Sequence, residues 1–491
     1  MRKINSFSVL FALPFFVVPL GDLNAQEIAS ARLSSLGGLS TAVSTDIDAI
    51  GTNPANLVAL SKGNVAIEFA PFSVNAGSDF LSLGLYNQYM TGQVTANGDT
   101  VGTYLNSQDK QDILNAFPGG LGNVRANVNI RDFGLSIRVF NFALGFAVDD
   151  RVGVRSVIPN SPLNFALNGL TWGSSLSLTG INVQSYWYRT YSANYAMELP
   201  QIPVIPKRIA SSIEVGIGLK FVTGFSYSSM QTTNASIYAD STSHAFDVNM
   251  GLSSTRAGLI SRIISKAAKS EVGDTSVNFN PFAPEGTGLG LDIGVSAKVM
   301  KFVKVGISLT DIGSISWSKD VINTAGADTS FAFGGFDPAK VNVPGSKSNL
   351  DSLNDAFKNY FKNKDSVGSS FSTSLPTKMN IGASVNLDEI FPKIPGQLMV
   401  AIDYHQGFNN EFNNSTTPEF VVGAEWKPAR VIPIRTGLGF GGAYGFRWSL
   451  GFGLDLAAWD IDIGVGTFNA IVAPTAAKSV SITLSILKFR F

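Results

Sequence analysis

The segment YGFRWSLGFGLDL, residues 444–456, alternates strictly between large apolar side chains and small or charged ones. Its apolar members are Tyr444, Phe446, Trp448, Leu450, Phe452, Leu454 and Leu456. A repeat of two residues predicts a β-strand whose two faces meet different surroundings. In a soluble sandwich the second face would carry Thr, Lys and Glu, but here it is mostly Gly and Ser with Arg447 and Asp455. That combination is typical of a membrane β-barrel, with an apolar face toward lipid and a small, polar face toward the lumen.

The same alternation recurs along most of the chain. It is found in residues 133–139, 142–148, 213–225, 289–297, 379–387, 398–404, 420–426 and 432–440. These runs bracket the roughly 9 to 11 residues that a tilted membrane strand needs. We therefore predict an all-β fold, a transmembrane antiparallel β-barrel of about 14 to 16 strands with a few short helices in its loops. The strand number stays open between residues 89 and 125 and between residues 151 and 211.

Composition narrows the alternatives. Apolar residues make up 45% of the chain and charged residues 15%, against about 25% charged residues in a typical soluble protein. Cys is absent, so an exported form of this chain has no disulfide framework. Lys and Arg together number 36, as do Asp and Glu, and this balance gives no indication of a nucleic-acid partner. The alternative to a membrane barrel is a secreted soluble β-protein, which would be extracted without detergent.

Both ends of the chain indicate export. Arg2 and Lys3 precede an apolar run at residues 9–20, and this pattern predicts a signal peptide at residues 1–25, cleaved near Ala25/Gln26. The last segment ends in Phe489 and Phe491, which resembles the assembly signal of bacterial outer-membrane barrels. We therefore expect the outer membrane of a Gram-negative bacterium, with outer-membrane lipid and the barrel assembly machinery as partners.

The last predicted strand, residues 479–491, changes parity along its length. Val480, Ile482 and Leu484 share one parity, whereas Phe489 and Phe491 share the other. Either a bulge near Ile486 or a strand that is apolar on both faces would explain the change.

Three insertions interrupt the strand pattern with helical spacing, at residues 108–117, 257–270 and 349–362. They predict short helices that either cap a barrel mouth or bind a protein partner. We divide the chain into a signal peptide at 1–25, a hatch at 26–60, and a barrel at 61–491 with insertions near 254–286 and 319–377.

The segment before the first strand is rich in small residues and contains a progression of distinctive positions. These are Arg32, Gly37, Gly38, Asp46, Asn53, Pro54 and Ala55. The progression resembles the N-terminal hatch of FadL-type outer-membrane transporters and of the related Por-type proteins, although Asn56 stands where that family usually has Gly. The chain is similar, more closely, to an uncharacterised family of outer-membrane proteins, through Pro71-Phe72-Ser73 and Tyr86-Asn87-Gln88-Tyr89. The resemblance implies a hatch that plugs the lumen, with hydrophobic substrates passing through it or leaving sideways through the wall.

Enzymatic motifs are scarce. The chain has two His, His244 and His405, and no zinc or nucleophile-elbow motif. Close carboxylate pairs such as Asp46 with Asp48 are typical of loop or lumen hydrogen bonding more than of glycosidase chemistry. We predict no catalytic residues, no metal site, no cofactor and no enzymatic activity.

Charged residues on the small face of the predicted strands are expected to face the lumen. They are Glu214, Lys220, Asp292, Lys298, Asp403, Arg435, Arg447 and Asp455. Charges inside a barrel require a partner or water, so we expect an ion-pair network that braces the lumen. A site for a substrate headgroup is the alternative.

Our functional hypothesis rests mainly on the resemblance to FadL-type barrels. It is passive transport of a hydrophobic or small organic molecule, with displacement of residues 26–60 opening a path through the lumen. The alternative is a barrel without transport that docks partners of a secretion or surface-assembly machine through its long insertions.

Overall fold

The computed structural model describes residues 30–59, 63–94, 97–200, 210–243, 245–269, 280–324, 329–333, 365–442 and 445–491. The predicted signal peptide and the predicted helix at 349–362 lie outside these residues.

Fourteen antiparallel strands form a closed barrel. The first consists of β1 (Val65–Phe69) and β2 (Phe72–Ser78), which pair with β5 on one side and with β23 on the other. The others are β5 (Leu121–Val139), β6 (Phe142–Pro159), β8 (Asn182–Glu198), β9 (Ser212–Asp240), β11 (Gly286–Val299), β12 (Val303–Trp317), β16 (Phe371–Ser374) with β17 (Lys378–Asn386), β18 (Gln397–Gly407), β19 (Glu419–Ala429), β20 (Ile432–Gly441), β21 (Gly445–Asp455), β22 (Trp459–Val465) and β23 (Ser479–Arg490). The predicted all-β barrel is confirmed.

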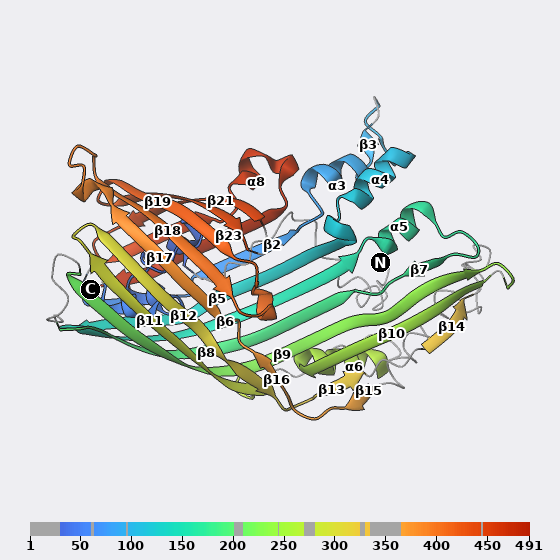
Figure 1. The fold of residues 1–491 in the computed structure, drawn as a ribbon, viewed down its shortest axis with the longest axis horizontal. Coiled ribbons are helices and arrows are strands. Elements are labelled where there is room, and N and C mark those ends of the chain that lie inside the picture. The colour runs from blue at the N-terminus through green and yellow to red at the C-terminus, as the bar shows by residue number, and fades with distance from the viewer. Residues whose placement is uncertain are drawn as a thin grey trace.

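The two ends of the barrel differ. Short turns, such as residues 140–141, 430–431 and 456–458, lie at the end that also holds the C-terminus (Figure 1). The other end, here called the long-loop end, carries the helices α3 (Leu83–Tyr89), α4 (Ser107–Asn115), α5 (Ser161–Asn168), α6 (Leu259–Lys269) and α8 (Asn469–Val472), and the 3₁₀ turns η3 (Pro118–Gly120), η6 (Glu411–Asn413) and η7 (Pro474–Ala476). The 3₁₀ turn η5 (Leu387–Glu389) lies at the short-turn end.

Two of the helices expected from spacing are confirmed as α4 and α6. In α4 the reason is local, because Asn106 and Asp109 form a capping box: the Asn106 side chain accepts from the Asp109 N–H at 3.0 Å, and the Asp109 carboxylate accepts from the Asn106 N–H at 2.9 Å. Such reciprocal bonds satisfy two backbone donors that a helix start otherwise leaves without partners.

The wall is much taller on one side than on the other. β9 has 29 residues, whereas β22 has 7, and the long strands extend far to the right in Figure 1. Further strands pair with this extension: β10 (Ala245–Gly258) and β7 (Ser175–Ser177) with β9, β13 (Ile322–Thr324) and β14 (Thr329–Phe333) with β10, and β15 (Asp365–Val367) with β13. A separate hairpin joins β3 (Gln93–Val94) to β4 (Thr100–Val101).

The alternating runs at residues 133–139, 142–148 and 213–225 are therefore much shorter than β5, β6 and β9, the strands that contain them, and β8 lies in a region where the sequence left the strands open. The outer part of β9 contains Ser228-Ser229 and Gln231-Thr232-Thr233-Asn234, so no apolar alternation marks it. A strand that extends beyond the lipid meets water and needs no apolar face.

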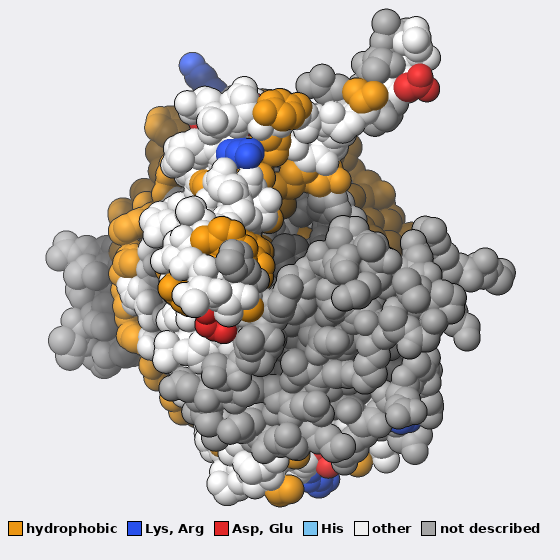
Figure 2. All heavy atoms as spheres, turned by 90° about the vertical axis from the view of Figure 1, so that its right-hand side faces the viewer, with side chains coloured by type: hydrophobic (Ala, Val, Ile, Leu, Met, Phe, Trp, Pro, Cys, Tyr) orange, Lys and Arg blue, Asp and Glu red, His pale blue; other side chains and the backbone are white. Residues whose placement is uncertain are grey.

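The outer face of the barrel is apolar, as contact with lipid requires. Phe221, Leu289, Ile307 and Phe452 are among many large apolar side chains exposed there. Figure 2, which looks onto the long-loop end, shows hydrophobic side chains along the left flank of the barrel.

No helix in the described part of the chain combines the length and the apolar composition needed to cross a membrane.

The change of parity in β23 comes from a bulge. Asp460 of β22 pairs with Lys488, and Asp462 pairs with Ser485, so β23 has one extra residue between them. Of the two explanations that the sequence left open, the bulge near Ile486 is confirmed. It turns Lys488 and Arg490 into the barrel, where they are 2% and 7% exposed.

Candidate functional site: the plugged lumen

Residues 30–59, here called the hatch, lie inside the barrel and contain α2 (Ala31–Ser35), η1 (Asp46–Ala49) and η2 (Pro54–Val58). α2 packs against β20 to β23, and η2 packs against β6, β8, β9 and β11. Apolar side chains of the hatch and of the wall form two buried clusters. One contains Leu33, Leu36, Leu39 and Val43 with Ala401 and Val421, and the other contains Ala49, Ile50, Leu57 and Val58 with Ala143, Ala147 and Ala196.

Glycines of the wall make room for the hatch. A Cβ added at any of ten of them would press on hatch atoms: Gly134, Gly145, Gly216, Gly294, Gly306, Gly382, Gly423, Gly437, Gly451 and Gly464. Several are cross-strand neighbours, such as Gly216 with Gly294 and Gly423 with Gly437. The glycine-rich face of the predicted strands therefore lies where the hatch backbone approaches the wall.

The Asn53-Pro54-Ala55 segment is held by neutral hydrogen bonds. Asn53 caps η2, since its side chain accepts from the Ala55 N–H at 3.2 Å, and its amide donates to Ser296 Oγ of β11 at 3.0 Å. The Ser296 hydroxyl in turn donates to Asn56 Oδ1 at 2.7 Å. Asn56, the departure from the FadL-type pattern, thus provides an acceptor for the wall.

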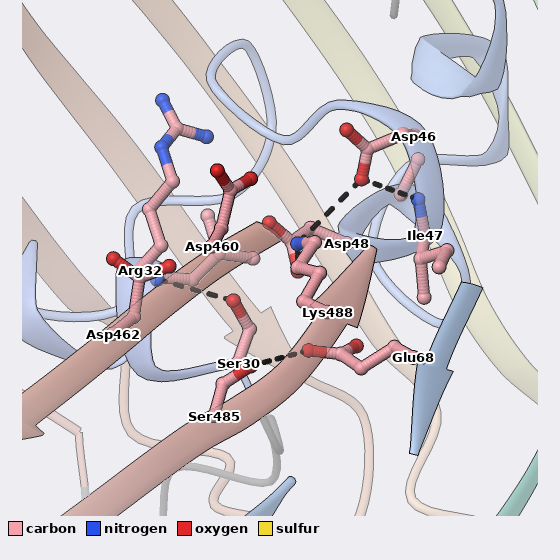
Figure 3. Close-up of polar contacts among 12 residues, drawn as sticks. Ser30, Arg32, Asp46, Ile47, Asp48, Glu68, Asp460, Asp462, Ser485 and Lys488 are labelled. Carbon is pink, nitrogen blue, oxygen red and sulfur yellow. Dashed lines mark hydrogen bonds and ion pairs between the residues drawn. The ribbon is translucent and has the colours of Figure 1, made fainter. Parts of the chain in front are cut away.

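A charged contact joins the hatch to the last strand (Figure 3). Asp46 and Asp48 of η1 turn toward β23, where Lys488 Nζ lies 3.0 Å from Asp48 Oδ1 and Arg490 lies 3.0 Å from Asp46 Oδ2. Burial opposes ionisation of Asp48, but the charges of Lys488 and Arg32 outweigh it and lower the pKa of the Asp48 carboxyl to about 2.

Glu68 of β1 and Asp460 of β22 complete the surroundings of the two cations. Glu68 pairs in register with Lys488 and accepts from Ser485 Oγ at 2.6 Å, and Asp460 forms an ion pair with Arg490.

A second charged contact joins α2 to the wall. Arg32 donates to Glu425 of β19 at 2.9 Å, and Glu425 also accepts from Arg435 of β20 at 2.6 Å. Arg435 also forms an ion pair with Asp462 of β22 at 2.5 Å. One hatch cation is therefore part of a chain of ion pairs with residues of β19, β20 and β22.

Two further wall residues bind the hatch backbone. Asp403 of β18 accepts from the N–H groups of Ser40 and Thr41, at 2.7 and 2.9 Å. Arg447 of β21 donates to the carbonyl oxygen of Gly37 at 2.5 Å. These two wall side chains thus provide hydrogen-bond partners for buried backbone groups of the hatch.

A third network joins residues of the wall. Lys220 of β9 lies 2.8 Å from Asp292 of β11 and 2.5 Å from Asp311 of β12, and Arg151 of β6 lies 3.2 Å from Asp311. Gly294, two residues from Asp292, contacts Asn53 of the hatch. This network therefore lies close to the neutral part of the hatch.

The structure places most of the expected lumen charges inside the barrel, but in separate contacts. Lys220 and Asp292 meet in the wall network, while Asp403, Arg435 and Arg447 surround the hatch; Asp455 pairs with Lys427 at 2.7 Å. Glu214 pairs with Lys304 at 2.7 Å near the short turns. Lys298 is exposed, because it lies two residues before the turn at Met300, beyond the enclosed part of the lumen.

Sequence reasoning missed Lys488, Arg490, Arg131 and Glu425. Lys488 and Arg490 were hidden by the bulge, which reverses their parity. Arg131 donates to the Ile47 carbonyl oxygen at 2.9 Å. It ends a run at residues 125–131 in which polar and apolar side chains alternate, and this run could have indicated a strand.

The long-loop half of the lumen has a different character. Tyr186, Tyr188, Tyr227, Trp317 and Phe412 form a buried apolar cluster there with smaller residues. In the described parts of the chain, no three His, Cys, Asp or Glu side chains are grouped so that they could hold a metal ion. The site thus combines a hatch, buried ion pairs and an aromatic cluster.

A family model described as "Family of unknown function (DUF5723)" matches residues 54–467. The chain belongs to the DUF5723 family. A comparison with curated proteins finds no match.

Solved structures similar to the chain include two toluene transporters and a FadL homologue. The Ralstonia pickettii toluene transporter TbuX is 12% identical, with 95% of this chain and 99% of that chain covered and a TM-score of 0.47. The P. putida toluene transporter TodX is 10% identical, with 95% and 98% covered and a TM-score of 0.43. A Pseudomonas aeruginosa FadL homologue is 10% identical, with 96% and 99% covered and a TM-score of 0.44.

Proposed function

We propose that this barrel lies in the outer membrane of a Gram-negative bacterium and lets a hydrophobic or small organic molecule pass down its concentration gradient. The observation that supports the proposal most is the hatch, a separate segment that fills the lumen and is held by non-covalent contacts. Its partners would be outer-membrane lipid and, through the C-terminal Phe489 and Phe491, the barrel assembly machinery.

Movement of the whole hatch would be costly. It would leave Asp46, Asp48 and Arg32 without their partners inside the barrel, and breaking a buried pair costs about 3–5 kcal/mol. Residues 52–59 are different, since their polar contacts with the wall are neutral hydrogen bonds through Thr52, Asn53 and Asn56. We therefore narrow the expected displacement of residues 26–60 to the part around η2.

Disulfides can test this, because the chain has no Cys of its own. The Asn56→Cys/Ser296→Cys pair would fix η2 to β11, at a position where Ser296 Oγ and Asn56 Oδ1 are 2.7 Å apart. The Ser34→Cys/Thr483→Cys pair would fix α2 to β23, where the two hydroxyl oxygens are 3.0 Å apart. Ser73→Cys/Thr483→Cys joins two wall strands at 3.1 Å and leaves the hatch free.

The measurement is uptake of a radiolabelled aromatic compound by intact cells that carry each variant, before and after reduction. Oxidised N56C/S296C is expected to block uptake until it is reduced. The other two pairs are expected to transport in both states. Undiminished uptake through oxidised N56C/S296C would show that η2 is not the gate.

Binding of a protein partner at the long loops is the second candidate. It is favoured by three side chains in the connections of that end that are each 90% exposed: Tyr104, Phe282 and Val367, the last residue of β15. Purification of the native complex from membranes, with the triple Ala variant as control, tests it. Partner recovery that is the same for both proteins would contradict a role for these side chains.

A further inference from the structure

The loop between β18 and β19, residues 408–418, inserts one phenyl ring into the aromatic cluster. The ring of Phe412 is fully buried. Its centroid lies 4.8 Å from the ring of Tyr186, 4.9 Å from that of Tyr188 and 6.2 Å from that of Tyr227. The Tyr186 and Tyr227 contacts are edge-to-face, an arrangement that the ring quadrupole favours. We call the three tyrosines the ring box.

The ring box belongs to the wall and faces the lumen. Tyr186 and Tyr188 lie on β8 and Tyr227 on β9, with Tyr186 and Tyr227 paired across the strands. Arg151, a member of the wall network, donates to the Tyr188 hydroxyl at 3.3 Å. Trp317 of β12 lies behind the box, 5.5 Å from the Tyr227 ring. The box therefore stands on long strands that hold it in place.

Phe412 also presents a hydrogen-bond acceptor to the box. The Tyr186 hydroxyl donates to the Phe412 carbonyl oxygen at 3.0 Å. The loop thus places an aromatic ring against the ring box and a hydrogen-bond acceptor beside the Tyr186 hydroxyl. A small aromatic alcohol or ketone would make the same two kinds of contact.

The backbone and the attachments of the loop suit a reversible occupant. Phe412 has φ 49° and ψ 45°, a left-handed conformation that a non-glycine residue rarely adopts and that clusters at functional sites. Hydrogen bonds attach the loop, for example from Gln184 to Glu411 at 2.8 Å and from Asn414 to the Thr377 carbonyl at 3.0 Å.

We propose that the ring box is a binding site for one aromatic ring bearing a hydrogen-bond acceptor, and that Phe412 occupies it until such a ligand displaces the ring. The inference rests on the proposed transport function and names the chemical class of the cargo. Withdrawal of Phe412 would also relieve the left-handed backbone conformation at that residue.

Benzyl alcohol is a suitable probe, and its binding to the detergent-extracted protein can be followed by tryptophan fluorescence with Trp317→Phe as the blank. Phe412→Ala removes the internal occupant. Since apparent affinity scales with the fraction of protein whose site is open, F412A is expected to bind benzyl alcohol at least about tenfold more tightly than the wild type.

Phe371→Ala is the matched control. Phe371 packs on Tyr227 at 5.5 Å but comes from β16, so its removal is expected to leave the affinity unchanged. A milder variant covers the case in which F412A does not fold: Glu411→Ala loses the bond to Gln184, whereas Glu411→Gln keeps an acceptor for it. E411A is expected to bind more tightly than E411Q.

The hydrogen bond from the Tyr186 hydroxyl to the acceptor of the ligand has its own test. Tyr186→Phe removes the donor and is expected to reduce the preference for benzyl alcohol over toluene. The proposal is overturned if F412A and E411A bind no more tightly than the wild type, or if F371A gains as much as F412A. Because binding is measured without transport, the two proposals can fail separately. Tight binding with no uptake removes only the transport function, and gated uptake with no ring binding removes only this site.

Discussion

Glycines in the wall and carboxylates in the hatch are the residues on which the closed lumen depends. A glycine such as Gly437 lets the hatch backbone approach the wall, because a Cβ at this position would press on Leu36. A carboxylate such as Asp48 then attaches the hatch to Lys488 across a buried contact. Shape and charge act at different positions, so each can be altered without the other.

Gly437→Ala should displace the part of the hatch around Leu36 from the wall. Overpacking of a filled interior costs about 1–3 kcal/mol, and here the hatch is the element that can yield. We expect greater sensitivity of cells to bulky antibiotics. Gly102→Ala is the control, since a Cβ at Gly102 has no atom within 4 Å. Equal sensitivity of the two strains would argue against a packed hatch at this position.

Asp48 should make the barrel sensitive to acid. Its pKa is lowered from 3.8 to about 2, so its stabilising contribution is complete above the unfolded value and is lost as the pH falls toward about 2. Asp48→Asn should therefore lower the stability at neutral pH by roughly 1–3 kcal/mol and flatten the acid decline. Heat-resistant gel mobility as a function of pH measures both. Asp99→Asn, in an exposed turn, is the control, and acid curves that are parallel for D48N and the wild type would refute the assignment.

At the scale of elements, β23 shows how one extra residue decides a contact. The bulge between Asp460 and Asp462 reverses the parity of the last residues. Lys488 and Arg490 thereby face the hatch, while Leu487 and Phe491 are exposed on the outer face.

Deletion of Ile486 and Leu487 together should reverse the facing of the residues that follow. Lys488 and Arg490 would then face the lipid, where a cation costs about 2–4 kcal/mol at the midplane and less near the interface. We expect little folded barrel on gels run without heating. Deletion of Ile486 alone removes only the extra residue, keeps Lys488 opposite Asp460 and should fold. A double-deletion variant that is as heat-resistant as the single deletion would show that the inward facing of Lys488 and Arg490 is dispensable.

At the scale of the whole molecule, the barrel has a tall wall on one side and a short one on the other. The tall side carries the ring box and the strands β10 and β13 to β15, whereas the hatch lies nearer the short turns. A solute that entered at the long-loop end would meet the aromatic cluster before it met the hatch.

This arrangement predicts the orientation in the membrane. Long loops of such barrels are extracellular and short turns are periplasmic. An epitope inserted after Gly102 should therefore be labelled by antibody on intact cells. The same epitope inserted after Arg430 should be labelled only after the outer membrane is opened. The reverse pattern would invert the proposed direction of entry.

Much of this architecture could be predicted from local patterns. The alternation in residues 444–456 and its repeats indicated the barrel, because each strand must separate lipid from lumen on its own. The helices α4 and α6 followed from spacing in the same way. The tall part of β9 could not be predicted, since a strand that extends beyond the lipid needs no continuous apolar face.

Side chains that are neighbours along the chain were enough to specify the alternating strands and the two-sided character of the wall, because both depend on local order. Only the tertiary structure decided which groups meet. Asp48 and Lys488 are brought together by barrel closure and by a one-residue bulge, and Phe412 reaches Tyr186 through a loop from the other side of the mouth. Contacts between residues hundreds of positions apart leave no periodic trace, because they depend on register and closure rather than on local order.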